Sequence, residues 1–68
     1  MRYAIIIEKS ETGFGAYVPD LPGCVAAGAT LAETETLIRE AVEFHLDGLR
    51  EDGIEVPAPS ALAQYVEV

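Results

Sequence analysis

The chain has 68 residues, 12 acidic and 4 basic side chains and a formal net charge of −8, so we expect one domain with a small core. A single cysteine and a single histidine exclude an intrachain disulfide and a Cys/His zinc site within one chain. The acidic balance argues against nucleic acid as a direct partner, because phosphate binding needs clustered Lys and Arg, and it favours a basic protein partner.

No signal peptide or membrane span is predicted, because the early apolar run of residues 4–7 is too short for either. The unpaired cysteine fits a reducing compartment. The sequence therefore predicts a cytoplasmic protein. We also expect an oligomer, because another subunit is the remaining way to stabilise so small a core.

Two short strands joined by a hairpin turn are predicted at the start of the chain. Residues 2–8 (RYAIIIE) and 14–18 (FGAYV) are rich in β-branched and aromatic side chains. Residues 9–13 (KSETG) have the composition of a turn. The run of three isoleucines predicts that the first strand is buried on both faces and central in its sheet.

A stiff turn follows in the stretch YVPDLPGC, residues 17–24. Pro19 ends the second strand because it has no N–H to donate. Residues 21–24 fit a type II turn, with proline at the second position and glycine at the third. We expect Asp20 to accept backbone N–H bonds in an Asx-type turn. A third strand is predicted over residues 24–29.

A long amphipathic helix is predicted after the third strand. Thr30-Leu31-Ala32-Glu33 is a capping box, and the helix is expected to end near Asp52, with Gly53 suited to the position after the cap. At about 100° per residue, one face of the helix is apolar. This face contains Leu37, Ile38, Ala41, Val42, His45, Leu46 and Leu49.

A last strand is predicted over residues 62–68 (LAQYVEV), after a stiff connector at residues 53–60. A right-handed crossover would lay it parallel to the first strand. The predicted fold is a single α+β domain, residues 1–68, with the order β-β-β-α-β, a sheet of order 3-2-1-4 and one helix on one face. Apolar side chains on the other face predict at least a homodimer, built on that face or on an edge strand.

Four segments, in this order and spacing, make the chain similar to the HicB-like antitoxin family. They are VPDLPGC, the G-x-T of residues 28–30, EAVEFHLDGLREDG at 40–53 and VPAP at 56–59. The resemblance covers nearly the whole chain and implies a truncated ribonuclease H-like fold. It also implies a partner: the typical member binds HicA, a small basic RNase that cleaves messenger RNA, and covers its active-site region.

Many members of this family add a C-terminal DNA-binding module. The sequence reaches Val68 directly after the predicted last strand, with no further helix or basic arm. We therefore expect no direct DNA binding by this chain.

Acidic residues are the candidate partner-binding side chains. Closely spaced carboxylates on the polar helix face can occupy the phosphate-binding surface of a basic RNase. These are Glu40, Glu43, Asp47 and Glu51. Asp20 on the stiff turn adds another.

Two other functions stay open. One is a metal-dependent ribonuclease H-like nuclease, in which Glu8, Glu33, Glu35 and Glu67 would gather at one end of the sheet around Mg²⁺. The other is an orphan protein-interaction module without a toxin partner. For the favoured antitoxin function we expect no enzymatic activity, no catalytic residue, no cofactor and no metal. His45 is then a core or interface histidine and Cys24 a buried small hydrophobe.

Overall fold

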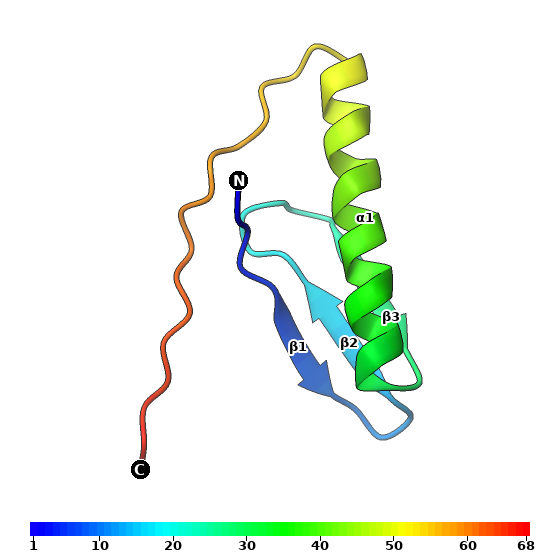
Figure 1. Ribbon diagram of the computed structural model, residues 1–68, viewed down its shortest axis with the longest axis vertical. Helices are drawn as coiled ribbons and strands as arrows, with labels where there is room; N and C mark the ends of the chain where they lie inside the picture. Colours follow the sequence, from blue (N-terminus) through cyan, green and yellow to red (C-terminus); the bar gives the residue numbers. More distant parts are fainter.

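One helix lies across one face of a three-stranded antiparallel sheet in the computed structural model, which describes residues 1–68 (Figure 1). The strands β1 (Ile6–Lys9), β2 (Phe14–Tyr17) and β3 (Val25–Gly28) precede the helix α1 (Leu31–Glu51). β2 is the central strand and pairs with both neighbours. The α+β class, the first three strands and the single helix are therefore confirmed.

The predicted fourth strand does not form. Residues 54–68, the C-terminal segment, run on the β1 side of the sheet (Figure 1), but they make no backbone hydrogen bond to β1. The order 3-2-1-4 is therefore wrong in its last member, and β1 is an edge strand. Ile6 and Ile7 of β1 are only half-buried, and Ile5, just before the strand, is 39% exposed, because α1 packs mainly on β2 and β3 and nothing pairs with the outer edge of β1.

The stiff turn between β2 and β3 folds into the core. The Cys24 N–H donates to the Leu21 carbonyl at 3.0 Å, and Gly23 has a φ of 84°, as the predicted type II turn requires. Val18, Leu21 and Cys24 are buried, together with Ala16 and Ile38. The turn therefore supplies three of the five buried apolar side chains of the core.

α1 begins with the predicted cap. The Thr30 hydroxyl oxygen accepts the Glu33 N–H at 3.1 Å, and the Glu33 carboxylate accepts the Ala29 N–H at 3.2 Å, one residue before the usual target. Gly28 lies against the first turn of α1, so closely that an added Cβ would be 2.7 Å from the Thr34 hydroxyl oxygen. The G-x-T motif thus combines a glycine that lets β3 lie close to α1 with a threonine that caps α1.

The inner side of α1 packs on the core through Ile38, Ala41, Val42 and Leu46. Leu37 was expected on this side, but it lies at its margin and is 37% exposed. Although α1 has 21 residues, it is too polar to cross a membrane.

The face of the sheet opposite α1 is open. The strand register places Ile6, Tyr17 and Val25 in one row across the three strands. Tyr17 and Val25 are exposed. The open face is therefore partly apolar, as predicted, whereas the homodimer remains a prediction.

Candidate partner-binding surfaces

The carboxylates predicted to bind a partner lie exposed along α1. These are Glu40, Glu43, Asp47 and Glu51. Asp47 and Arg50 form the only ion pair in the chain, with 3.6 Å between the charged atoms, and both side chains are largely exposed. The other three carboxylates have no cationic partner in the chain, so this surface presents uncompensated negative charge to the solvent.

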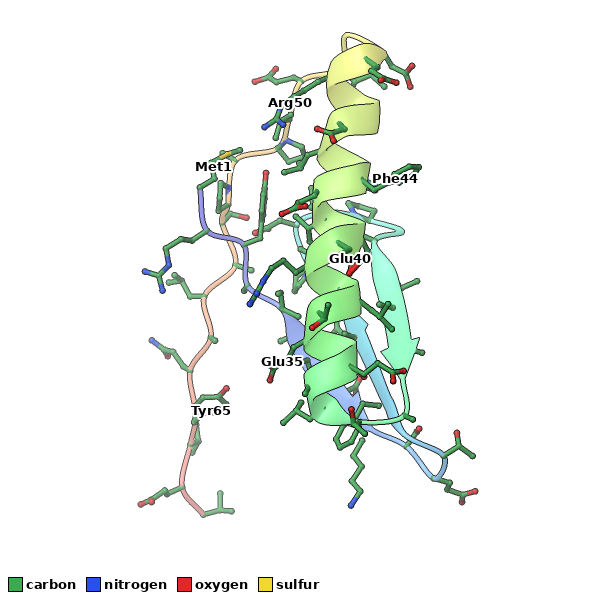
Figure 2. The ribbon with its side chains drawn as sticks, turned by 45° about the vertical axis from the view of Figure 1, so that its right-hand side comes forward. Met1, Glu35, Glu40, Phe44, Arg50 and Tyr65 are labelled. Carbon is green, nitrogen blue, oxygen red and sulfur yellow. The ribbon has the colours of Figure 1, made fainter.

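Phe44 lies among these carboxylates and is 83% exposed. At about 100° per residue, Glu40 and Asp47 lie on the same side of α1 as Phe44, whereas Glu43 lies further round the helix. Figure 2 shows the Phe44 ring pointing away from the helix, on the side opposite Glu35 and Arg50. Phe44 was not among the predicted partner-binding residues, although the sequence carries a signal for it: it is a large aromatic side chain outside the apolar stripe of the helix.

We call the exposed side chains of Glu40, Glu43, Phe44, Asp47 and Glu51 the acidic helix face. Protein–protein interfaces combine an aromatic anchor at the centre with a charged or polar rim. The acidic helix face has this composition, with the net charge that suits a basic partner.

Asp20 holds the C-terminal segment instead of its own turn. Its Oδ2 accepts the N–H of Ser60 at 2.9 Å and the N–H of Ala61 at 3.1 Å, and its Oδ1 accepts the Ser60 hydroxyl at 2.8 Å. Hydrogen bonds from the backbone of Ser60 and Ala61 and from the Ser60 side chain lower the pKa of Asp20. The expected Asx-type turn is therefore wrong, since the donors lie 40 and 41 residues away. Whether Asp20 also contacts a partner protein stays a prediction.

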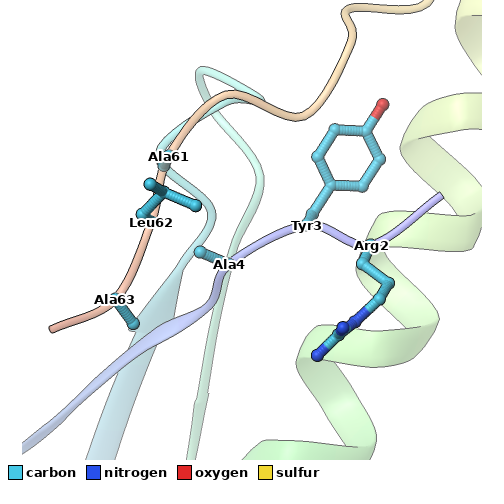
Figure 3. Close-up of a pocket in the computed structure, with 6 residues that line it drawn as sticks. All are labelled: Arg2, Tyr3, Ala4, Ala61, Leu62 and Ala63. Carbon is cyan, nitrogen blue, oxygen red and sulfur yellow. The ribbon is translucent and has the colours of Figure 1, made fainter.

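A shallow groove separates the two ends of the chain beside this anchor. Figure 3 shows its lining, which consists of Arg2, Tyr3 and Ala4 on one side and Ala61, Leu62 and Ala63 on the other. The Tyr3 hydroxyl donates to the carbonyl of Pro57 and so ties the ends together at one edge. Most of this lining is apolar, so the groove is suited to apolar side chains or to a strand.

The side chains considered for catalysis do not come together. No three His, Cys, Asp or Glu side chains lie close enough to hold a metal ion, so the carboxylate cluster required by the nuclease alternative is not assembled. Glu33 caps α1 through Ala29, and Glu67 lies exposed on the unpaired C-terminal segment. Burial raises the pKa of Cys24, as expected of a small buried hydrophobe. His45 is half-buried.

A family profile and individual relatives match nearly the whole length of this chain. Residues 3–68 match the profile of the family described as "HicB_like antitoxin of bacterial toxin-antitoxin system". A 14.9 kDa protein of Haemophilus phage HP1 is 44% identical over 66 residues, which are 97% of this chain and 50% of the phage protein. A UPF0150 protein of Thermoplasma acidophilum is 36% identical over 62 residues, which are 90% of each chain. The chain therefore spans about half of the phage relative and most of the Thermoplasma one.

A solved structure shares the fold. One chain of a HicA3 and HicB3 toxin-antitoxin complex matches with a TM-score of 0.74 and 37% sequence identity, over 87% of this chain and 69% of that chain. The matched part is longer than residues 1–52, which end with the C-cap of α1, so the likeness includes residues beyond the strands and the helix.

Proposed function

Because the chain belongs to the HicB-like antitoxin family of bacterial toxin-antitoxin systems, we propose that it binds and neutralises a small basic HicA-type toxin that cleaves messenger RNA. The observation that carries the proposal is the family match over residues 3–68. The likeness to a chain of a HicA3 and HicB3 complex supports the same partner.

In the proposed function, the protein acts only by binding the toxin; it has no catalytic activity and does not contact DNA itself. Its net charge of −8 disfavours contact with nucleic acid. We place it in the cytoplasm, where a messenger RNase meets its substrate. We also propose that the three antiparallel strands and the helix correspond to part of a truncated ribonuclease H-like fold.

The acidic helix face is the proposed toxin-binding surface. An RNA-cleaving protein carries positive charge to hold phosphates, and the carboxylates of this face offer a competing anionic surface. Charge of opposite sign on the two proteins accelerates their encounter, mainly at low salt. Phe44, 83% exposed among the carboxylates, supplies the apolar anchor that long-range charge attraction cannot provide.

Co-expression with a HicA-type toxin, followed by co-purification in rising salt, tests the partner. We expect a complex at low salt that blocks RNA cleavage by the toxin. The triple variant Glu40→Lys, Glu43→Lys, Asp47→Lys should slow association about 100-fold at low salt. Phe44→Ala should weaken binding by about 2 kcal/mol, roughly thirty-fold in Kd, mainly through faster dissociation.

A matched control changes the same charge elsewhere. Glu8, Glu11 and Glu55 are exposed and lie outside α1, so Glu8→Lys, Glu11→Lys, Glu55→Lys should have a much smaller effect on association. Absence of a complex at low salt would refute the toxin partner. A complex that tolerates the α1 triple variant as well as the control would keep the partner and refute the acidic helix face as its binding surface.

A further inference from the structure

We propose that residues 62–68 are a strand donor: in a homodimer, this stretch of each copy adds to the free edge of β1 in the other copy. The partner in this exchange is a second copy of this chain. It does not depend on the proposed toxin.

The isolated chain exposes more surface than a compact protein of its mass. Its accessible surface is 5344 Å², whereas a folded monomer of 7.3 kDa is expected to expose about 4,200 Å². Its radius of gyration is 13.1 Å, against about 11 Å expected for 68 residues. Two copies that buried this surplus would bury about 2,400 Å², more than the roughly 1,600 Å² of a standard stable interface.

Much of the exposed apolar surface lies in the proposed donor. Leu62, Tyr65, Val66 and Val68 are each 85% exposed or more. Aromatic and β-branched side chains favour strands, and the backbone of residues 62–68 makes no hydrogen bond within the chain. Glu67 is the only charged residue there. The stretch is thus extended and apolar, with free backbone donors and acceptors, as strand addition requires.

The acceptor is the outer edge of β1. β1 pairs with β2 on one side only, and unpaired edges attract further strands. The chain's own segment does not occupy this edge. Asp20 fixes it at Ser60 and Ala61, and the groove lies between residues 61–63 and residues 2–4 (Figure 3).

A second copy fits this edge better than a basic partner does. Two copies with a charge of −8 each repel one another, so their contact has to be apolar and through the backbone, as residues 62–68 allow. Every copy carries one donor strand and one free β1 edge. A reciprocal exchange around a two-fold axis therefore pairs each donor strand with the β1 edge of the other copy and leaves no donor or edge unpaired. A basic toxin finds only one carboxylate on this stretch, whereas the acidic helix face offers four.

The two proposed surfaces are on different parts of the molecule. Residues 62–68 run on the β1 side of the sheet, and α1 lies across the sheet from them (Figure 1). Exchange of the donor strands therefore leaves the acidic helix face free.

Sedimentation and amide hydrogen exchange on the full chain, without any toxin, test the exchange. We expect twice the 7.3 kDa mass at micromolar concentration and slow exchange of the amides of residues 62–68. Val66→Asp places a charge in the new interface and should weaken the dimer about ten-fold or more. Phe44→Asp makes the same change at another exposed apolar side chain and should leave the dimer intact.

Circular dichroism separates dimer loss from unfolding. Val66 is 85% exposed, so its replacement should leave the helical signal of α1 unchanged. A wild-type monomer would overturn the proposal, as would a dimer whose residues 62–68 exchange freely or a Val66→Asp variant that dimerises like the wild type. A monomer with protected residues 62–68 would also overturn it, because the chain's own segment would then occupy β1.

Discussion

Replacing Gly28 by alanine tests the close contact between β3 and the first turn of α1. The new Cβ would lie 2.7 Å from the Thr34 hydroxyl oxygen, 3.0 Å from a Glu33 carboxylate oxygen and 3.1 Å from the Thr34 backbone nitrogen. Thr34 is fully buried, and its hydroxyl donates to the Thr30 carbonyl at 2.8 Å. It therefore cannot rotate away without losing that bond inside the protein.

The expected cost follows from two opposing terms. Overpacking of a filled site costs about 1–3 kcal/mol. Alanine also restricts the unfolded chain, which stabilises the fold by about 0.4–1 kcal/mol, and Gly28 does not have the positive φ that would oppose alanine. We expect the free energy of unfolding to fall by about 1–2 kcal/mol, out of about 3–10 kcal/mol for a domain of this length. The melting temperature should fall by roughly 5–15 °C.

Urea unfolding followed by circular dichroism measures this loss. All variants should be compared at one protein concentration, because self-association would add to the apparent stability. Gly15→Ala is the matched control: it lies in the adjacent strand, and a Cβ there meets nothing within 4 Å. It should be neutral or slightly stabilising. If Gly28→Ala were as stable as Gly15→Ala, β3 and α1 would not be packed tightly enough at Gly28 to exclude a Cβ.

Three further predictions concern the cap, the anchor and the absence of catalysis. Thr30→Ala removes the acceptor for the Glu33 N–H and should cost about 1 kcal/mol in urea unfolding, whereas Thr36→Ala, on the exposed surface, should cost clearly less. Asp20 has a lowered pKa in the folded chain, so its anchor is present above the unfolded-state pKa and is lost as the pH falls through the folded-state pKa. In an NMR titration the Ser60 and Ala61 amides should therefore lose protection in acid, and Asp20→Asn should weaken their protection at neutral pH; unchanged protection in both cases would refute the anchor. The purified chain should leave RNA intact in the presence of Mg²⁺, and cleavage that disappears in Glu8→Gln would instead establish the nuclease.

The features that the sequence predicted well are encoded within a few residues. The Pro22-Gly23 pair specifies its turn through the two dihedral angles that it favours, and Thr30 with Glu33 specifies the start of α1 through bonds that span three residues. The strands β1 to β3 were predicted because each pairs with its neighbour in the sequence. Their ends differ from the predicted ones by at most four residues, since pairing partners decide where a strand begins and ends.

The features that were missed depend on distant parts of the chain. Strand propensity in residues 62–68 predicts an extended backbone, but it does not say which edge, if any, that backbone joins. The bonds of Asp20 to Ser60 and Ala61 have no local signature, because a carboxylate beside a turn suits nearby donors equally well. Phe44 was missed for a different reason: the prediction of a basic partner rested on charge, and Phe44 carries none.

The pairing of each element with its neighbour in the chain has a kinetic consequence. Loops between β1, β2 and β3 are short, and α1 packs on the two strands that precede it, so little loop-closure entropy opposes their assembly. Mixed domains of strands and helices with such local contacts fold faster than all-β domains, whose contacts are mostly between distant residues. We expect residues 1–53 to fold first as one unit. The C-terminal segment, held through Asp20 and Tyr3, would then join a surface that is already formed.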